Sequence, residues 1–298
     1  MLNHDQKADF DALLPGQSTE AGASRRTALK VALGVGYAAS AMPIMAQTAI
    51  KTSSDGLKTG EIVYEVNGFK VPAFYAMPAG KTNCPVVLVV QEIFGVHEYI
   101  ADTCRRFAKA GYLAIATELY VRQGDPTQYG EIGKLIAEVV DKVPDAQVMA
   151  DLDGAVKWAA ANGGDATKVA VTGFCWGGRI TWLYAAHGPV KAGVAWYGRL
   201  VGTANDLTPK NPIDLAANLR APVLGLYGEK DGGIPLDTVE KMKTALAAGN
   251  AASKGSQFVV YPDAPHAFHA DYRPSYRQQA AEDGFKQCLA WFKSNGVS

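Results

Sequence analysis

Runs of apolar residues alternate with polar segments along most of the chain, and their spacing distinguishes strands from helices. The unbroken apolar run at 85–90, Pro-Val-Val-Leu-Val-Val, predicts a central strand that is covered on both faces. Residues 61–66 and 71–77 flank Asn67 and Gly68, a dipeptide typical of two-residue hairpin turns. These two segments therefore predict a strand pair.

The rest of the chain continues as alternating strands and helices. Further strands are predicted at 112–117, 168–172, 192–196, 223–227 and 257–261, and helices at 100–110, 132–140, 146–160, 179–186, 236–248 and 276–292. No internal repeat or low-complexity linker interrupts this series. The order predicts an α/β fold in one domain, with a mostly parallel central sheet flanked by helices.

Residues 1–46 differ in kind from the rest of the chain. A polar opening leads to Arg25 and Arg26, and an apolar run of small residues covers 31–45. This resembles a twin-arginine export signal, although Ala28 stands where such signals usually have a bulky apolar residue. A membrane anchor or an amphipathic helix is the alternative, but the run is shorter than the roughly 20 strongly apolar residues that a span needs.

The signal divides the chain into three expected parts. Cleavage is expected after Ala41 or Ala46, residues 47–60 would be a flexible lead-in, and 61–298 would form the folded domain. The twin-arginine translocase is then a partner during export, and the mature protein is periplasmic or secreted without a stable membrane anchor. If the signal does not function, the protein is cytoplasmic.

Charge and cysteine content argue against several classes of partner. The 298 residues are 48% hydrophobic, the chain is long enough for one large α/β domain or two small ones, and Lys+Arg 29 balances Asp+Glu 29. Nothing therefore suggests nucleic acid or an anionic membrane surface as a partner. The four cysteines are scattered without Cys-x-x-Cys spacing, so neither a metal site nor a disulfide framework is indicated, and we expect no cofactor.

The hexapeptide at 173–178, Gly-Phe-Cys-Trp-Gly-Gly, lies between a predicted strand and a predicted helix. It is a cysteine version of the Gly-x-Ser-x-Gly nucleophile elbow, in which side chains at Gly173 and Gly177 would collide with backbone. The helix N-terminus favours a thiolate at its first residues. Glycine-flanked cysteines also arise by chance, but the context predicts Cys175 as a nucleophile.

An acid and a base are expected on loops that come after later strands. Asp231 lies in a glycine-rich turn after the strand at 223–227, and His266 comes after the strand at 257–261. The chain order of nucleophile, acid and histidine is that of α/β-hydrolases and differs from the orders in chymotrypsin-like and subtilisin-like proteases. The pattern therefore predicts a triad with Cys175.

Four further positions are open to two interpretations. Glu92 leaves the apolar strand ahead of a glycine turn and is either a buried structural hydrogen-bonding group or a member of the active site. Tyr120 and Tyr197, at strand ends, are either walls of the substrate pocket or core residues. His269 is expected to face solvent or the substrate mouth, in a structural role.

Four segments, at 91–95, 173–178, 228–231 and 265–268, together resemble the dienelactone hydrolase (carboxymethylenebutenolidase) family. The resemblance covers nearly all of the expected mature chain. It implies an α/β-hydrolase fold and metal-free hydrolysis of a small enol-lactone through a cysteine acyl-enzyme.

The resemblance also implies residue roles. They are nucleophile for Cys175, base for His266, orientation of that base for Asp231, and help in removing the thiol proton for Glu92. The backbone amides of Trp176 and Ile93 are expected to hold the oxyanion.

One departure from the family concerns arginine. The best-known members bind the carboxylate of a small dienelactone with a pair of arginines. Ala270 stands at the place of one, and 123–134, where the other is expected, contains no arginine. Arg122 and Arg273 are the nearby candidates for binding a substrate carboxylate, and the alternative is that both are solvated surface residues.

Two rival functions share these features. A general carboxylesterase or thioesterase would use the same catalytic residues and differ only in its pocket. A non-catalytic binding protein on the hydrolase fold is expected to have a damaged triad, and no member of the triad is missing here.

Overall fold

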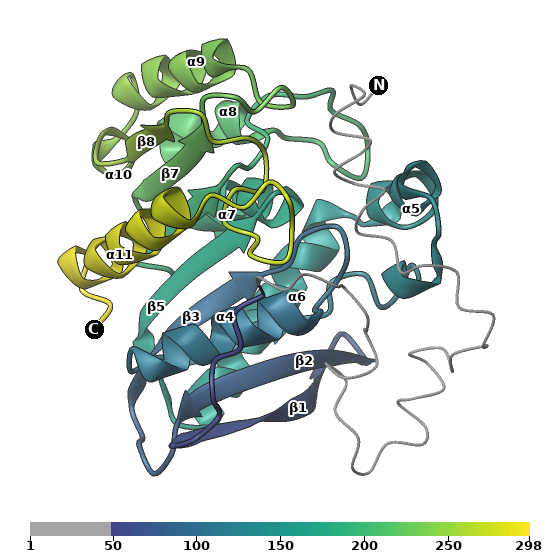
Figure 1. The fold of residues 1–298 in the computed structure, drawn as a ribbon, viewed down its shortest axis with the longest axis vertical. Helices are drawn as coiled ribbons and strands as arrows, with labels where there is room; N and C mark the ends of the chain where they lie inside the picture. The colour runs from purple at the N-terminus through teal and green to yellow at the C-terminus, as the bar shows by residue number, and fades with distance from the viewer. Residues whose placement is uncertain (1–48) are drawn as a thin grey trace.

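The computed structural model describes residues 49–298, which form one eight-stranded sheet flanked by helices (Figure 1). The strands are β1 (Leu57–Val66), β2 (Phe69–Pro78), β3 (Cys84–Val90), β4 (Leu113–Thr117), β5 (Gly164–Phe174), β6 (Ala192–Trp196), β7 (Val223–Gly228) and β8 (Gln257–Tyr261). Their order in the sheet is β1-β2-β4-β3-β5-β6-β7-β8. The predicted α/β architecture is confirmed.

The direction of the strands depends on how they are connected. β1 and β2 pair antiparallel around Asn67 and Gly68, whose positive φ angles of 50° and 76° are those the predicted tight turn needs. β2 also pairs antiparallel with β4, and every pair from β4 across to β8 is parallel. The inner strands β4, β6 and β7 are buried along their whole length, as strands covered on both faces must be.

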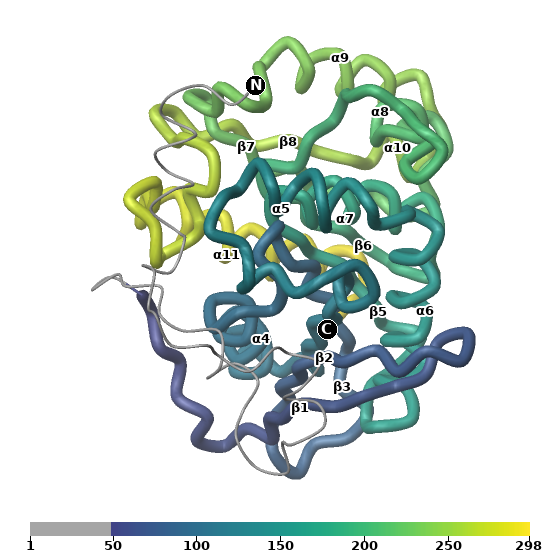
Figure 2. The backbone as a smooth tube through the Cα atoms, turned by 90° about the vertical axis from the view of Figure 1, so that its right-hand side faces the viewer, coloured from purple at the N-terminus to yellow at the C-terminus, as the bar shows by residue number. Residues whose placement is uncertain are grey.

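The helices form the two outer layers. They are α4 (Glu98–Lys109), α5 (Ile132–Glu138), α6 (Asp145–Ala161), α7 (Trp176–His187), α8 (Pro212–Leu215), α9 (Leu236–Ala247), α10 (Ala251–Lys254) and α11 (Gln278–Ser294), with short 3-10 helices η1 (Pro126–Gln128), η2 (Val140–Lys142) and η3 (Ala216–Asn218). Figures 1 and 2 show α4 and α11 on one face of the sheet and α6 and α7 on the other. The core lies between these layers.

The start of the folded part differs from the prediction. β1 begins at Leu57, and upstream of it the amide of Thr52 donates to Asp102 Oδ1 at 2.6 Å while Arg105 Nε donates to the Thr52 carbonyl at 3.1 Å. Residues 57–60 of the expected lead-in over 47–60 therefore belong to β1, and side chains of α4 contact the chain before it at Thr52.

The predicted signal peptide, residues 1–46, lies outside the described residues. Within 49–298, no helix is long and apolar enough to cross a membrane.

Several parallel strands bring their carboxyl ends to the same edge of the sheet. Glu92 comes after β3, Cys175 after β5, Tyr197 after β6, Asp231 after β7 and His266 after β8. In open α/β sheets, loops at this edge carry ligand-binding and catalytic side chains. The topology therefore gathers residues that are far apart in sequence.

Candidate active site

Cys175 lies in a strained turn between β5 and α7. Its φ of 55° and ψ of −113° are rare for a residue with a side chain, and its amide donates to the Trp196 carbonyl at 3.0 Å. Such backbone strain persists only where the surroundings enforce it, and it gathers at functional sites. The turn places Cys175 at the N-terminus of α7, as the elbow motif predicts.

The glycines of the elbow are required by close backbone contacts. A Cβ atom on Gly177 would lie 2.5 Å from the carbonyl oxygen of Gln91, and one on Gly173 would lie 2.5 Å from the carbonyl carbon of Gly177. Neither neighbour is a flexible side chain that could move away. The elbow is therefore packed directly against the end of β3.

Asp231 holds His266 in a fixed orientation. Nδ1 of His266 lies 2.7 Å from Oδ2 of Asp231, and Oδ1 of the same carboxylate accepts from the amides of Gly233 and Ile234 at 2.9 and 3.2 Å. Since the carboxylate accepts the Nδ1 proton, Nε2 is left for chemistry. Burial by itself would lower the pKa of His266, but the negative charges of Asp231 and Cys175 outweigh it and raise the pKa to about 10.

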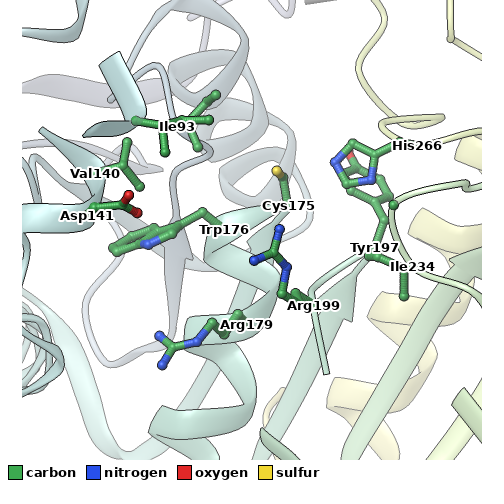
Figure 3. Close-up of a pocket in the computed structure, with 12 residues that line it drawn as sticks. Ile93, Val140, Asp141, Cys175, Trp176, Arg179, Tyr197, Arg199, Ile234 and His266 are labelled. Atoms are coloured by element: carbon green, nitrogen blue, oxygen red, sulfur yellow. The ribbon is translucent and has the colours of Figure 1, made fainter. Parts of the chain in front are cut away.

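Cys175 and His266 meet at one cavity of ≈ 200 Å³, here called the Cys175 cavity (Figure 3). Its other lining residues are Ile93, Ile136, Val140, Asp141, Trp176, Arg179, Tyr197, Arg199, Gly233 and Ile234. Of the residues predicted from the sequence, Ile93, Trp176 and Tyr197 therefore share this space with the nucleophile and base, and Asp231 is joined to it through His266.

Glu92 lies outside this cavity in a buried polar cluster. Its Oε1 accepts from His97 Nε2 at 2.9 Å and from the Tyr272 hydroxyl, and Arg273 Nη2 lies 3.9 Å from Oε2. Burial would raise the pKa of Glu92, but the Arg273 guanidinium and the His97 contact outweigh it and hold the pKa at about 2. In this arrangement Glu92 is a stable anion and a weak base.

The structure shows no metal-binding arrangement in residues 49–298. No group of three or more His, Cys, Asp and Glu side chains is placed to hold an ion there, and all four cysteines are free.

Comparison with known proteins decides the family. The sequence model of the dienelactone hydrolase family matches residues 71–296. The chain belongs to the dienelactone hydrolase family. Together with the fold, this membership makes the protein a hydrolase built on the α/β-hydrolase fold.

Relatives of this dienelactone hydrolase family member match along most of their length. A protein of Methylorubrum extorquens named "Putative carboxymethylenebutenolidase" is 55% identical over 291 residues, covering 97% of this chain and 99% of the relative. One of the same name from Escherichia coli K12 is 53% identical, covering 88% of this chain and 96% of the relative. The crystal structure titled "Putative Dienelactone Hydrolase" from Klebsiella pneumoniae has a TM-score of 0.78 at 57% identity, covering 80% of this chain and 98% of that one.

Neither arginine expected to bind a substrate carboxylate lines the Cys175 cavity of this family member. Arg122 donates to both carboxylate oxygens of Asp151, at 2.6 and 2.8 Å, and stacks on Phe69 beside a separate surface hollow. Arg273 is buried beside Glu92. Both side chains therefore lie beside buried carboxylates and outside the lining of the cavity.

Sequence reasoning missed two arginines that do line the cavity. Arg179, in the first turns of α7, is held by Asp145 at 2.7 and 2.8 Å and by the Lys210 carbonyl at 2.8 Å. Arg199 is exposed and comes two residues after Tyr197. Its place just beyond the carboxyl end of β6 was the available signal, because that edge of the sheet carries the site.

His269 was expected near solvent or the substrate mouth and Tyr120 at the pocket wall or in the core, and the structure places both of them in the interior. His269 does not face solvent: it is buried, its Nδ1 lies 2.6 Å from the Tyr99 hydroxyl, and its ring packs against Phe174 and Trp196. Tyr120 is fully buried, and its ring packs edge-on against the ring of Trp176 with the two ring centroids 4.9 Å apart. Tyr120 therefore supports the wall of the cavity from behind.

Proposed function

We propose that this protein hydrolyses a small lactone or ester through a cysteine acyl-enzyme, with Cys175 as nucleophile, His266 as base and Asp231 as the group that orients the base. One observation carries the proposal. The strained elbow presents Cys175 to the same cavity as a histidine whose far nitrogen is held by a buried carboxylate. That is the arrangement by which triads activate a nucleophile.

The first step forms the thiolate. Nε2 of His266 takes the proton from the Cys175 thiol, and the raised pKa of His266 favours the resulting imidazolium. Asp231 keeps that charge paired. The sulfur then attacks the carbonyl carbon of the substrate, and the carbonyl oxygen becomes an oxyanion.

Backbone amides are proposed to stabilise this oxyanion. Trp176 is the first residue of α7, so its amide has no partner inside the helix. Ile93 lies on the loop after β3 and lines the same cavity. Donors of this kind are worth roughly 3–4 kcal/mol each to the transition state.

Collapse of the intermediate expels the leaving oxygen, which takes the proton from His266 and leaves an acyl group on Cys175. Water then attacks the acyl-enzyme with His266 as base, and the acid product departs. In a lactone the leaving oxygen stays attached to the acyl group, so the product is a single hydroxy- or oxo-acid.

Glu92 is proposed to assist thiol activation when substrate binds. In the described arrangement its carboxylate is engaged by His97, Tyr272 and Arg273. It can therefore accept a proton only after some of these contacts are broken. Any contribution of Glu92 as a base is tied to movement of the cluster, whereas His266 is already in place.

A substrate panel tests the proposal. The purified protein is assayed with a small enol-lactone, an aryl ester and a thioester of matched acyl length, and Cys175→Ala is assayed beside it. The proposed function expects lactone or ester hydrolysis that the variant loses. Hydrolysis confined to the thioester would instead assign the protein as a thioesterase, and no hydrolysis of any substrate would contradict the proposal.

A further inference from the structure

The chain just ahead of β1 is attached to two buried carboxylates. The amide and the hydroxyl of Thr52 donate to Asp102 of α4 at 2.6 and 3.1 Å, and the amide of Ile50 donates to the carboxylate of Asp271. Asp102 and Asp271 are each 1% exposed. Residues 50–52 are here called the N-terminal strap, which passes along α4 in Figure 1. The strap lies outside residues 71–296, the part of the chain that the family model matches.

One guanidinium joins the two carboxylates. Arg106 Nε donates to Asp102 Oδ2 at 2.7 Å, and Arg106 Nη2 donates to Asp271 Oδ2. Burial raises the pKa of Asp271, while Arg106 and the Ile50 amide oppose that rise and favour the carboxylate. Since a buried ion that loses a partner is left uncompensated, these groups hold one another in place.

Asp271 connects the strap to Glu92. It lies in the loop between β8 and α11, directly before Tyr272 and Arg273, whose side chains engage Glu92. The backbone is turned there, and the amide of Arg273 donates to the Ala270 carbonyl at 3.0 Å. A displacement of Asp271 would therefore carry Tyr272 and Arg273 with it.

We propose that Asp271 and Arg106 are positioning residues for Glu92 and that the N-terminal strap completes their anchor, so that the chain ahead of β1 helps to set the geometry of thiol activation. This inference rests on the proposed function and on the role of Glu92 within it. The strap, Arg106 and Asp271 lie outside the lining of the Cys175 cavity. They therefore act on the orientation of Glu92 and leave the binding of substrate unchanged.

The rival interpretation is that the strap only stabilises the fold. Its loss would then disturb activity whether or not residue 92 carries a carboxylate. A strap that positions Glu92 should instead have no further effect on acylation once Glu92→Gln has removed the base. Coupled residues of this kind give non-additive effects, which a double-mutant cycle measures.

A proline at position 50 isolates the strap, because proline has no N–H to donate to Asp271. Ile50→Ala is the matched control, since it keeps the amide and shortens a side chain that is 43% exposed. Asp271→Asn removes the charge of the carboxylate with little change of shape. Arg106→Lys keeps the positive charge but not the planar group that joins both carboxylates.

Each change is made in the full chain with and without Glu92→Gln. Acylation is measured in single-turnover experiments with 4-nitrophenyl acetate, which give the rate constant and the half-saturating concentration separately. Hydrogen exchange at the amide of Arg273 reports on the loop itself. Should Asp271→Asn fail to fold, Ile50→Pro and Arg106→Lys carry the test, because they keep both buried carboxylates.

For Ile50→Pro and Asp271→Asn we expect acylation to slow by about 10-fold, as for a misplaced catalytic group, with the half-saturating concentration changed by less than about 2-fold. Arg106→Lys should lose less, and Ile50→Ala should behave as the wild type. In the Glu92→Gln chain the same changes should alter acylation by less than about 2-fold. Exchange at Arg273 should be faster in Ile50→Pro than in Ile50→Ala.

Three outcomes overturn the inference while leaving Cys175 and His266 in their proposed roles. One is equal slowing with and without Glu92→Gln, and another is unchanged acylation in every strap variant. The third is a Glu92→Gln chain that acylates as the wild type does. If the wild type is acylated neither by this ester nor by a lactone, the proposed function itself fails.

Discussion

The pKa of His266 depends on both Asp231 and Cys175. Because burial lowers the pKa of His266 while Asp231 and Cys175 together raise it to about 10, removing the sulfur should lower that pKa. We expect this shift in Cys175→Ala, measured by tracking the His266 ring signals with pH in NMR. Asp231→Asn should also lower the pKa. An unchanged pKa in Cys175→Ala would mean that the sulfur carries no charge beside the ring.

The free energy of unfolding should also depend on the protonation state of His266. Its folded pKa of about 10 exceeds the ordinary 6.5, so the stability it contributes is fully present below pH 6.5 and is lost as pH rises through about 10. Glu92 works in the opposite direction. Its pKa falls from 4.5 to about 2, so its contribution is present above pH 4.5 and is lost as pH falls through about 2.

Glu92→Gln tests the buried carboxylate with little change of shape. We expect slower acylation in single-turnover kinetics with little change in substrate binding, because the variant has no base to offer. Thermal unfolding across pH provides the control. The stability difference between wild type and variant should shrink as pH falls from 4.5 toward 2. Unchanged acylation would remove Glu92 from the mechanism and leave it a structural anion.

At this scale, sequence pattern could indicate the proposed triad because each member comes within a few residues of a strand end and the chain order is that of α/β-hydrolases. It left Glu92 open between a structural and a catalytic role. Its partner His97 lies on the same loop, but Tyr272 and Arg273 come from a distant loop, and only the folded chain brings them to this carboxylate. Packing between distant segments also explains why His269 is buried rather than exposed, since it contacts Tyr99, Phe174 and Trp196.

At the scale of elements, the elbow turn requires glycine because neighbouring backbone leaves no room for a side chain. Gly177→Ala would place a methyl group 2.5 Å from the Gln91 carbonyl oxygen, and overpacking of this kind costs about 1–3 kcal/mol. We expect a lower melting temperature and a displaced Cys175. Gly133→Ala is the matched control, since it has open space inside α5 and should stabilise by up to about 1 kcal/mol. Equal effects of the two changes would contradict this account of the elbow.

The elements themselves were largely predictable from hydrophobic spacing. β6 and β8 begin and end at the predicted residues, while β1 and β5 start earlier than predicted. The early residues of both strands are mostly polar or small, so they carry little apolar signal. Partner strands order them, through pairs such as Leu57 with Pro78 and Cys84 with Gly164.

At the scale of the whole molecule, we propose export by the twin-arginine route, which concerns residues outside the described part. Changing both Arg25 and Arg26 to lysine should retain the precursor in the cytoplasm, because the twin-arginine translocase recognises the paired arginines of the signal. Fractionation of cells that express each form measures this. Export at the wild-type level in the double variant would rule out that route.

Charge placement is the feature of the whole molecule that sequence could not supply. Arg122, Arg273 and Arg199 all lie near predicted strand ends or motifs, so a position near a strand end does not by itself decide which one reaches the cavity. Two of them are drawn to the buried carboxylates Asp151 and Glu92, and the third is left facing the cavity. Which arginine faces the cavity therefore depends on where the buried carboxylates of other elements lie.

The most direct test of the proposed mechanism is the mass of the protein during turnover. Rapid quenching in acid with an activated ester should show a transient mass increase equal to the acyl group, and peptide mapping should place it on Cys175. Cys175→Ala should show no adduct and lose about 10⁴-fold or more in kcat. An adduct on another residue, or a variant that keeps substantial activity, would contradict the assignment of Cys175 as the nucleophile.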